Sequence, residues 1–216
     1  MQERFLTSYN ISAKNQKYWI PLTWTTSEEL NFTDTEPRIW LNKDDLSINI
    51  DKNANWYILN IREIGFYRVN YDKNNWIQLI NVLNGNNFTQ ILDVNRAQLI
   101  DDSLNLARAG YIDYDIALNL SKYLTNETNY LPWKSMTSAS AYLNQRIEGD
   151  AEIKKLYNKY ALQLVEKAYN EYGFNEDMEK DSLLHQLTRE LVLSWACRFG
   201  HKDCIKQAKE YFRKMT

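Results

Sequence analysis

Only two histidines and two cysteines occur in the 216-residue sequence, and a metal site or a nucleophilic centre would usually be built from such residues. A hydrolytic zinc site needs several imidazoles, thiolates or carboxylates held on a rigid element. His185 is followed by Gln, Leu, Thr and Arg, so the His-Glu-x-x-His pattern is absent. The sequence favours a solvated or capping role for His185 and His201, and it predicts no metal ligand.

The remaining patterns that accompany catalysis are also absent from the sequence. The six glycines form no Gly-x-Gly-x-x-Gly or phosphate-loop motif, and no nucleophile-elbow sequence supports a serine triad. The adjacent acids Asp101-Asp102, Asp44-Asp45 and Glu28-Glu29 are interpreted as solvated faces, because helical neighbours point about 100° apart. We therefore expect no catalytic residue and no cofactor in this chain.

The two cysteines are separated by six residues. On one continuous helix the Cα atoms of Cys197 and Cys204 would lie about 10 Å apart, which is too far for a disulfide. Gly200 follows an apolar helical segment and can end it in the left-handed conformation, so that the chain folds back and brings the sulfurs together. This favours a disulfide, with two free thiols or a Cys-His-Cys metal site that uses His201 as the alternatives.

Composition and charge describe an ordinary globular chain. Twenty-six Lys and Arg residues face 28 Asp and Glu residues, and 44% of the residues are hydrophobic. A near-neutral charge without a basic run argues against a nucleic-acid partner. No stretch approaches the ~20 consecutive apolar residues of a membrane span.

Glycosylation signals are more frequent than Asn content alone would produce. Three Asn-x-Ser/Thr sequons, at Asn31, Asn87 and Asn126, fall in predicted loops and are the glycosylation candidates; Asn10 and Asn119 carry two more, Asn119 within a predicted helix. The first residues lack the apolar segment of a signal peptide. The two observations are compatible if the chain is part of a longer, secreted protein.

The first third of the chain has the alternating pattern of strands. Alternation at residues 20–25 and 46–50, followed by two runs at 56–61 and 66–71 around Gly65, predicts antiparallel strands and hairpins. We expect residues 1–71 to form a small β-sandwich domain. Its core would hold the strand aromatics Trp56, Tyr57, Phe66, Tyr67 and Tyr71.

From residue 72 the hydrophobic period becomes helical. Asp72 is placed to cap a helix that ends near Gly85, and Gly110, Gly173 and Gly200 end later helices. Pro132 stands at the start of a helix that runs to about residue 147. Seven helices joined by short turns predict an α-helical superhelical domain over residues 72–216, of the HEAT or armadillo kind and truncated at its C-terminus. The fold class is therefore α+β and multidomain.

Some aromatic and charged residues allow two interpretations. Arg68 is either an outward charge or an anchor to a neighbouring domain. Four tyrosines of one long predicted helix either pack between helices, which is the more common use, or line a concave groove: Tyr157, Tyr160, Tyr169 and Tyr172.

Seven motifs, in order along the chain, resemble those of the zinc aminopeptidases of the aminopeptidase N and endoplasmic-reticulum aminopeptidase group, including insect forms. They are Gln2–Phe5, Tyr18–Thr23, Gly65–Asp72, Asn95–Asp102, Leu106–Gly110, Tyr130–Lys134 and Ser194–Cys197. The resemblance covers the part of those enzymes after the catalytic domain. It also implies that Cys197 and Cys204 form the disulfide of that family.

The resemblance implies a supporting role, because the zinc motif, the exopeptidase motif and the catalytic tyrosine of that family have no counterpart here. The parent enzyme would bind zinc in an upstream catalytic domain and remove N-terminal residues from peptides at the cell surface or outside the cell. This portion would enclose the substrate chamber, meet peptide substrate indirectly, and take part in homodimer contacts. The alternative is a free-standing α-solenoid scaffold that binds a protein or peptide.

Overall fold

The computed structural model describes residues 18–42, 50, 53–177, 179 and 181–215. The predicted strand at residues 46–50 and the motif Gln2–Phe5 lie outside these residues, except for Ile50, which is not in a strand. The described chain forms two compact units, one that ends at Leu120 and one that begins at Ser121.

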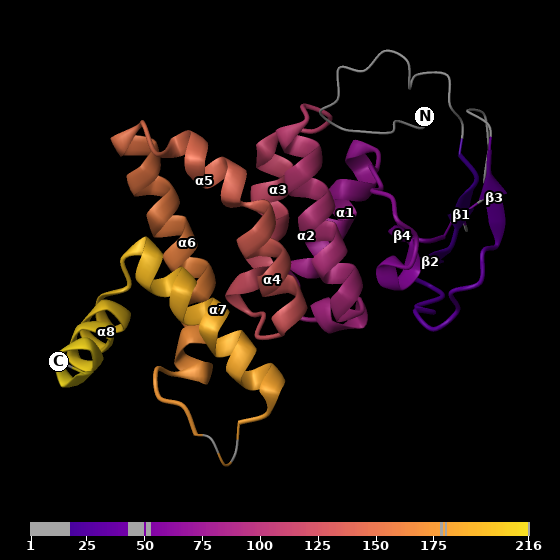
Figure 1. The fold of residues 1–216 in the computed structure, drawn as a ribbon. Coiled ribbons are helices and arrows are strands. Elements are labelled where there is room, and N and C mark those ends of the chain that lie inside the picture. Colours follow the sequence, from indigo (N-terminus) through magenta and orange to yellow (C-terminus); the bar gives the residue numbers. More distant parts are fainter. Residues whose placement is uncertain (1–17, 43–49, 51–52, 178, 180, 216) are drawn as a thin grey trace. The chain divides into compact units, whose positions relative to one another are not determined.

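Two small antiparallel sheets form the β part of the first unit (Figure 1). Strand β1 (Ile20–Leu22) pairs with β3 (Ile39–Leu41), and β2 (Trp24–Thr26) pairs with β4 (Tyr57–Leu59). The alternating run at residues 20–25 is interrupted at Thr23, so that its first part lies in one sheet and its second part in the other. The fold is α+β, as the change of period predicts.

The predicted hairpin of residues 56–61 and 66–71 is wrong. Only Tyr57–Leu59 of the first run is a strand, and residues 66–71 belong to no strand. Side-chain hydrogen bonds hold this segment instead: Val69 N donates to Asp102 Oδ2, and the Tyr71 hydroxyl accepts from Leu59 N of β4. Alternation in this segment therefore reflects anchoring on a helix, which side-chain pattern alone does not distinguish from strand pairing.

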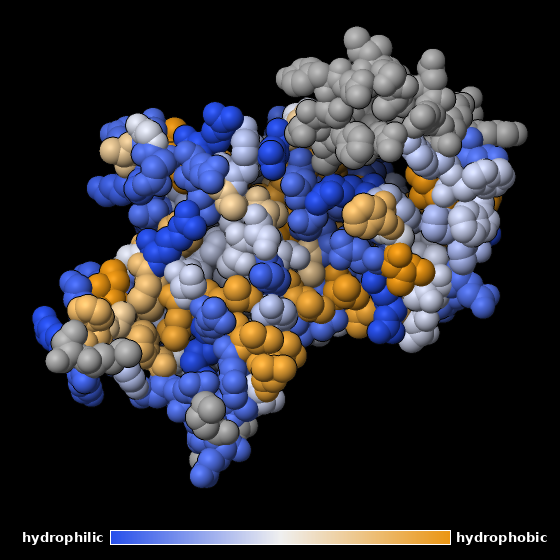
Figure 2. Space-filling view, viewed as in Figure 1, coloured by the Kyte–Doolittle hydropathy of each residue, from blue (hydrophilic) through white to orange (hydrophobic). Residues whose placement is uncertain are grey.

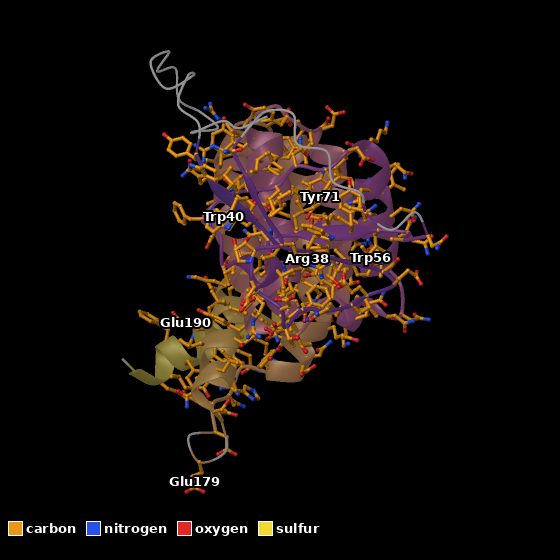
Figure 3. All side chains as sticks on the ribbon, turned by 90° about the vertical axis from the view of Figure 1, so that its right-hand side faces the viewer. Arg38, Trp40, Trp56, Tyr71, Glu179 and Glu190 are labelled. Carbon is orange, nitrogen blue, oxygen red and sulfur yellow. A yellow bond between two sulfur atoms is a disulfide. The ribbon has the colours of Figure 1, made fainter. Side chains whose placement is uncertain are left out.

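The aromatics of these two runs differ in burial. Trp56 and Tyr71 lie in the core, where the ring of Tyr71 meets those of Tyr57 and Trp76 edge-on. Phe66 is fully exposed, so its predicted core position is wrong. Figure 3 shows Trp40 pointing outward from β3, and half of its surface is exposed.

Three helices complete the first unit: α1 (Lys73–Leu83), α2 (Asp93–Arg108) and α3 (Tyr114–Ser121). Asp72 caps α1, because its side chain accepts from Asn75 N, as predicted. Helix α2 is buried on nearly all sides: Leu99, Ile100 and Leu104 are at most 2% exposed, and polar residues such as Asn95 and Asp102 are buried as well. Short 3-10 turns, η2 (Ile61–Glu63) and η3 (Phe88–Gln90), precede α1 and α2.

The second unit is helical. After the turn η4 (Lys122–Thr125) come α4 (Tyr130–Ala139), α5 (Ala141–Ile147), α6 (Ala151–Tyr172), α7 (Leu183–Phe199) and α8 (Lys202–Met215). The predicted single helix from Pro132 to residue 147 is divided at Ser140, which ends α4 and starts α5. Helix α7 packs on both α6 and α4, and Trp133 meets Trp195 edge-on in this core.

Glycine ends the two long helices as predicted. Gly173 follows α6 at φ 61°, and Gly200 follows α7 in the left-handed conformation at φ 96°. Asp150 caps the start of α6 by accepting from Glu152 N and Ile153 N. These caps fix where the long helices begin and end.

Candidate functional site

Four local clusters of side chains contain the residues to which the sequence assigns chemistry. The first is the corner between α7 and α8. Cys197 and Cys204 form a disulfide there, with their Cα atoms 5.3 Å apart across the turn at Gly200. Both cysteines of the sequence are thereby bonded, and neither is a free thiol or a metal ligand.

His201 caps α8 at this corner. Its Nδ1 accepts from Cys204 N at 3.3 Å, and its Nε2 lies 3.4 Å from Glu166 Oε2. The ring packs against that of Tyr169 at a centroid distance of 4.0 Å and an interplanar angle of 41°, and the Tyr169 hydroxyl donates to Asp203 Oδ2. The corner is thus a hydrogen-bonded junction of α6, α7 and α8, and His201 has the capping role that its sequence context favours.

The second cluster closes the connection between α6 and α7. Arg189 forms a buried ion pair with Asp181, 2.6 Å from Nη1 to Oδ2, and its Nε donates to Tyr172 O. His185 lies one turn before Arg189, with Nδ1 3.7 Å from Asp181 Oδ1 and its ring edge-on to Tyr172. This cluster holds a loop in place and contains no nucleophile.

The third cluster is the Asn60–Arg68 loop, which follows β4. Asn60, Arg62 and Glu63 all have positive φ, at 61°, 58° and 53°, although none is glycine. Asn60 is fully buried, and its side chain donates to Gly65 O and Tyr67 O while accepting from Gly65 N.

Helix α2 holds this loop through the hydrogen bonds of Asn95. Asn95, also fully buried, accepts from Arg62 N through Oδ1 and donates to Asn60 O and Gln98 Oε1 through Nδ2. On the opposite side, Thr23 accepts the backbone N–H groups of Asn60 and Ile61. The roles of Asn60 and Asn95 were not predicted; the abundance of asparagine is the one signal in the sequence that could have indicated them.

The fourth cluster joins the end of the loop to α2. Arg68 Nη2 lies 2.5 Å from Asp101 Oδ2, and its Nε lies 3.7 Å from Asp102 Oδ1. Asp102 is 2% exposed, so the interpretation of both acids as solvated is wrong for Asp102. Burial raises the pKa of Asp102 from 3.8 to about 8, and the charge of Asp101 adds to the effect. Arg68 therefore anchors the segment to α2.

The four tyrosines of α6 pack between helices rather than lining an open groove. Tyr157 and Tyr169 are at most 7% exposed, and Tyr160 Oη lies 2.7 Å from Ser121 Oγ. Tyr172 Oη donates to Thr128 O. The more common use predicted for these residues is the one that the structure shows.

The three glycosylation candidates lie at loops or element ends. Asn31 is partly exposed and accepts from Thr33 and Asp34 through its side chain, whereas Asn87 and Asn126 are exposed at the starts or ends of short turns. Asn119 lies within α3, and Asn10 lies outside the described residues.

Within the described part of the chain, the clusters stabilise corners and loops. No group of three or more His, Cys, Asp or Glu side chains in that part could hold a metal ion. None of its helices is long and apolar enough to cross a membrane. The described residues therefore form an α+β region, mostly helical, in which these clusters hold the loops and helix ends in place.

Comparison with known proteins identifies the class of this region. The ERAP1-like C-terminal domain model matches residues 56–216. Aminopeptidase N of Plutella xylostella is 38% identical over 96% of this chain and 22% of its own length. Glutamyl aminopeptidase of Rattus norvegicus is 31% identical over 98% of this chain and 22% of its own length.

The thyrotropin-releasing hormone-degrading ectoenzyme of Homo sapiens is 36% identical over 96% of this chain and 20% of its own length. The chain belongs to the ERAP1-like C-terminal domain family, and it is a C-terminal region of an aminopeptidase N or endoplasmic-reticulum aminopeptidase type of protein. It spans about a fifth of the length of these relatives.

Proposed function

We propose that this chain is the non-catalytic part of a zinc-dependent aminopeptidase, in which it supports and encloses the substrate chamber. The observation that carries the proposal is the family match over residues 56–216 together with relatives named as aminopeptidases. In this proposal, zinc and the catalytic groups belong to an upstream domain of the parent.

For the parent we propose the domain boundary that the sequence predicts, between residues 71 and 72. Residues 1–71 would contribute to a β-sandwich, since β1–β3 and β2–β4 each have two strands and isolated two-stranded sheets are marginal. Residues 72–216 would be the first part of a HEAT-like superhelix. Helices α6 and α7 pack together, with Arg189 Nε donating to Tyr172 O and Trp195 Nε1 to Ala161 O, so that they run antiparallel. This is the local arrangement that such a superhelix repeats.

An activity assay separates the chain from its parent. The parent polypeptide should hydrolyse aminoacyl-arylamides and lose that activity with a chelator, whereas the 216-residue chain should give no turnover. Chelator-sensitive turnover by the pure chain would overturn the non-catalytic role. For the chamber role, a photoreactive peptide bound to the parent should crosslink to residues 72–216, and an excess of unlabelled peptide should suppress it.

The proposal includes an extracellular or cell-surface location with glycans at Asn31, Asn87 and Asn126. The disulfide and the relative named as an ectoenzyme support it. Material secreted from eukaryotic cells should decrease in mass on glycosidase treatment. Each Asn→Gln substitution should remove one glycan mass, and an unchanged mass for all three would contradict the assignment.

A further inference from the structure

The Asn60–Arg68 loop presents two apolar side chains to solvent from a rigid base. Phe66 is fully exposed and Ile64 is 55% exposed, whereas Asn60, Ile61 and Gly65 beneath them are buried. Figure 2 shows isolated apolar surface beside β4, in the part of the first unit that contains this loop. Apolar residues are often exposed in flexible loops, but this loop is held in one conformation.

The loop conformation is strained and over-determined. Each non-glycine residue at positive φ costs on the order of 1 kcal/mol or more, and such residues persist only where the surroundings fix them. Here Arg62 N donates to the side chain of Asn95, Glu63 N donates to Asn60 O, and the side chain of Asn60 accepts from Gly65 N. The result is a preorganised loop that loses little conformational entropy on binding.

Charges at the base of the loop are already paired. Arg68 is bound to Asp101, and Val69 N, just beyond the loop, donates to Asp102. Tyr67 is turned inward, with its hydroxyl donating to Pro21 O at 2.7 Å. The apolar side chains that the loop offers to a partner are Phe66 and Ile64, which lie beside the exposed charged residues Arg62 and Glu63. A small apolar anchor of this kind can dominate interface energy.

We propose that Ile64 and Phe66 form an apolar anchor that docks onto the catalytic domain of the same parent polypeptide, an inference that rests on the proposed function. About four fifths of each relative lies outside the region that this chain matches. A second copy is a poor occupant, because a stable dimer needs ~800 Å² per partner, far more than two side chains supply. A covalently linked domain needs less, since linkage supplies a high effective concentration.

Thiol accessibility tests the docking in the parent polypeptide. Because Cys197 and Cys204 are disulfide-bonded, Phe66→Cys introduces a thiol that iodoacetamide can report in the 216-residue chain. In the parent, a cysteine-free background outside this chain keeps the same single reporter. We expect alkylation in the parent to be slower than in the chain alone by on the order of tenfold or more.

Asn86→Cys is the matched control, because Asn86 is exposed in the turn after α1, and its alkylation rate should not differ between the two proteins. Equal rates at position 66 in the two proteins would overturn the docking. Phe66→Asp provides a second measurement: it should leave the melting temperature of the chain unchanged, because Phe66 has no buried surface, and lower that of the parent. Asn86→Asp, at an exposed residue of the turn after α1, should lower neither melting temperature.

The same preparations separate this inference from the proposed function. Chelator-sensitive turnover by the parent without protection of position 66 would overturn the docking alone. Protection of position 66 in a parent without zinc-dependent turnover would contradict the catalytic domain as the occupant. Protection together with turnover, and a lower melting temperature for Phe66→Asp only in the parent, is the expected result.

Discussion

At the residue scale, Gly65 is the position where the Asn60–Arg68 loop admits no side chain. A Cβ atom there would lie 2.2 Å from Tyr67 Cε1 and 3.0 Å from Asn60 Oδ1. Tyr67 cannot move away freely, because its hydroxyl is bonded to Pro21 O. Gly65→Ala should lower the free energy of unfolding by about 1–3 kcal/mol, measured by urea denaturation. Gly149→Ala, with no atom within 4 Å, should change it by less than about 1 kcal/mol. Equal effects of the two substitutions would contradict this packing.

Asp102 makes a second prediction, concerning pH. Its pKa in the folded protein is raised to about 8 from 3.8, so the folded state retains a proton that the unfolded state has lost. The stabilisation is complete below about pH 4 and is lost as the pH rises through about 8. Asp102→Asn stays neutral and can still accept from Val69 N, so stability should depend less on pH between 4 and 8.

Denaturant unfolding at pH 5 and at pH 8 measures this difference in slope. Asp115→Asn, at an exposed position of α3, serves as the control and should retain the pH dependence of the original chain. A slope that is the same in Asp102→Asn and in the original chain would show that Asp102 is ionised in the folded state.

Residue-scale burial was the least predictable property from the sequence. The Asp101-Asp102 pair was placed on a helix correctly, but which acid faces the interior depends on where residues 66–71 cross α2. The role of Asn95 was not predicted for the same reason, because it depends on a contact with a segment 35 residues away. That of Asn60 depends on bonds to Gly65 and Tyr67 within a loop whose backbone conformation no periodic pattern indicates. Phe66 is exposed because of the local backbone conformation, and the hydrophobic period of the sequence does not indicate that conformation.

At the element scale, the helices were predictable where the sequence carries local signals: an apolar period, and at some ends a capping side chain or a terminal glycine. Asp72 and Gly200 stand at the ends that they predict. The break at Ser140 was not predicted, since no glycine or proline marks it. Strands were predicted less well, because their pairing partners are distant in the sequence, and residues 66–71 alternate without pairing.

The corner between α7 and α8 makes the element-scale prediction. The disulfide closes a loop with a sequence separation of 7, for which loop-closure entropy gives about 2–3 kcal/mol of stabilisation. Adding a reductant should lower the free energy of unfolding of the original chain by about this amount. The double variant Cys197→Ser, Cys204→Ser should show no response to reductant, and an equal response of both proteins would contradict the assignment.

At the scale of the whole molecule, apolar surface is distributed over both units. The first turns of α7 expose Leu183 and Leu184, and Figure 2 shows apolar surface there. Phe212 of α8 is 68% exposed beside a shallow pocket of about 350 Å³ that Ile205 and Ala208 also line. Contiguous apolar surface is where contacts with further protein are expected, and the chain spans about a fifth of the length of its relatives.

The whole-molecule prediction follows from this pocket. The folded 216-residue chain should bind a hydrophobic dye such as anilinonaphthalene sulfonate at neutral pH, and Phe212→Ser should reduce the fluorescence without loss of helical circular dichroism, because Phe212 is mostly exposed. Lys206→Ser, on the exposed polar side of α8, should leave the fluorescence unchanged. If the surface is covered by further polypeptide, the parent should bind less dye per molecule than the chain. Dye binding by the parent that equals or exceeds that of the chain would show that this face of α8 is open to solvent in both, and would favour a surface for an external partner.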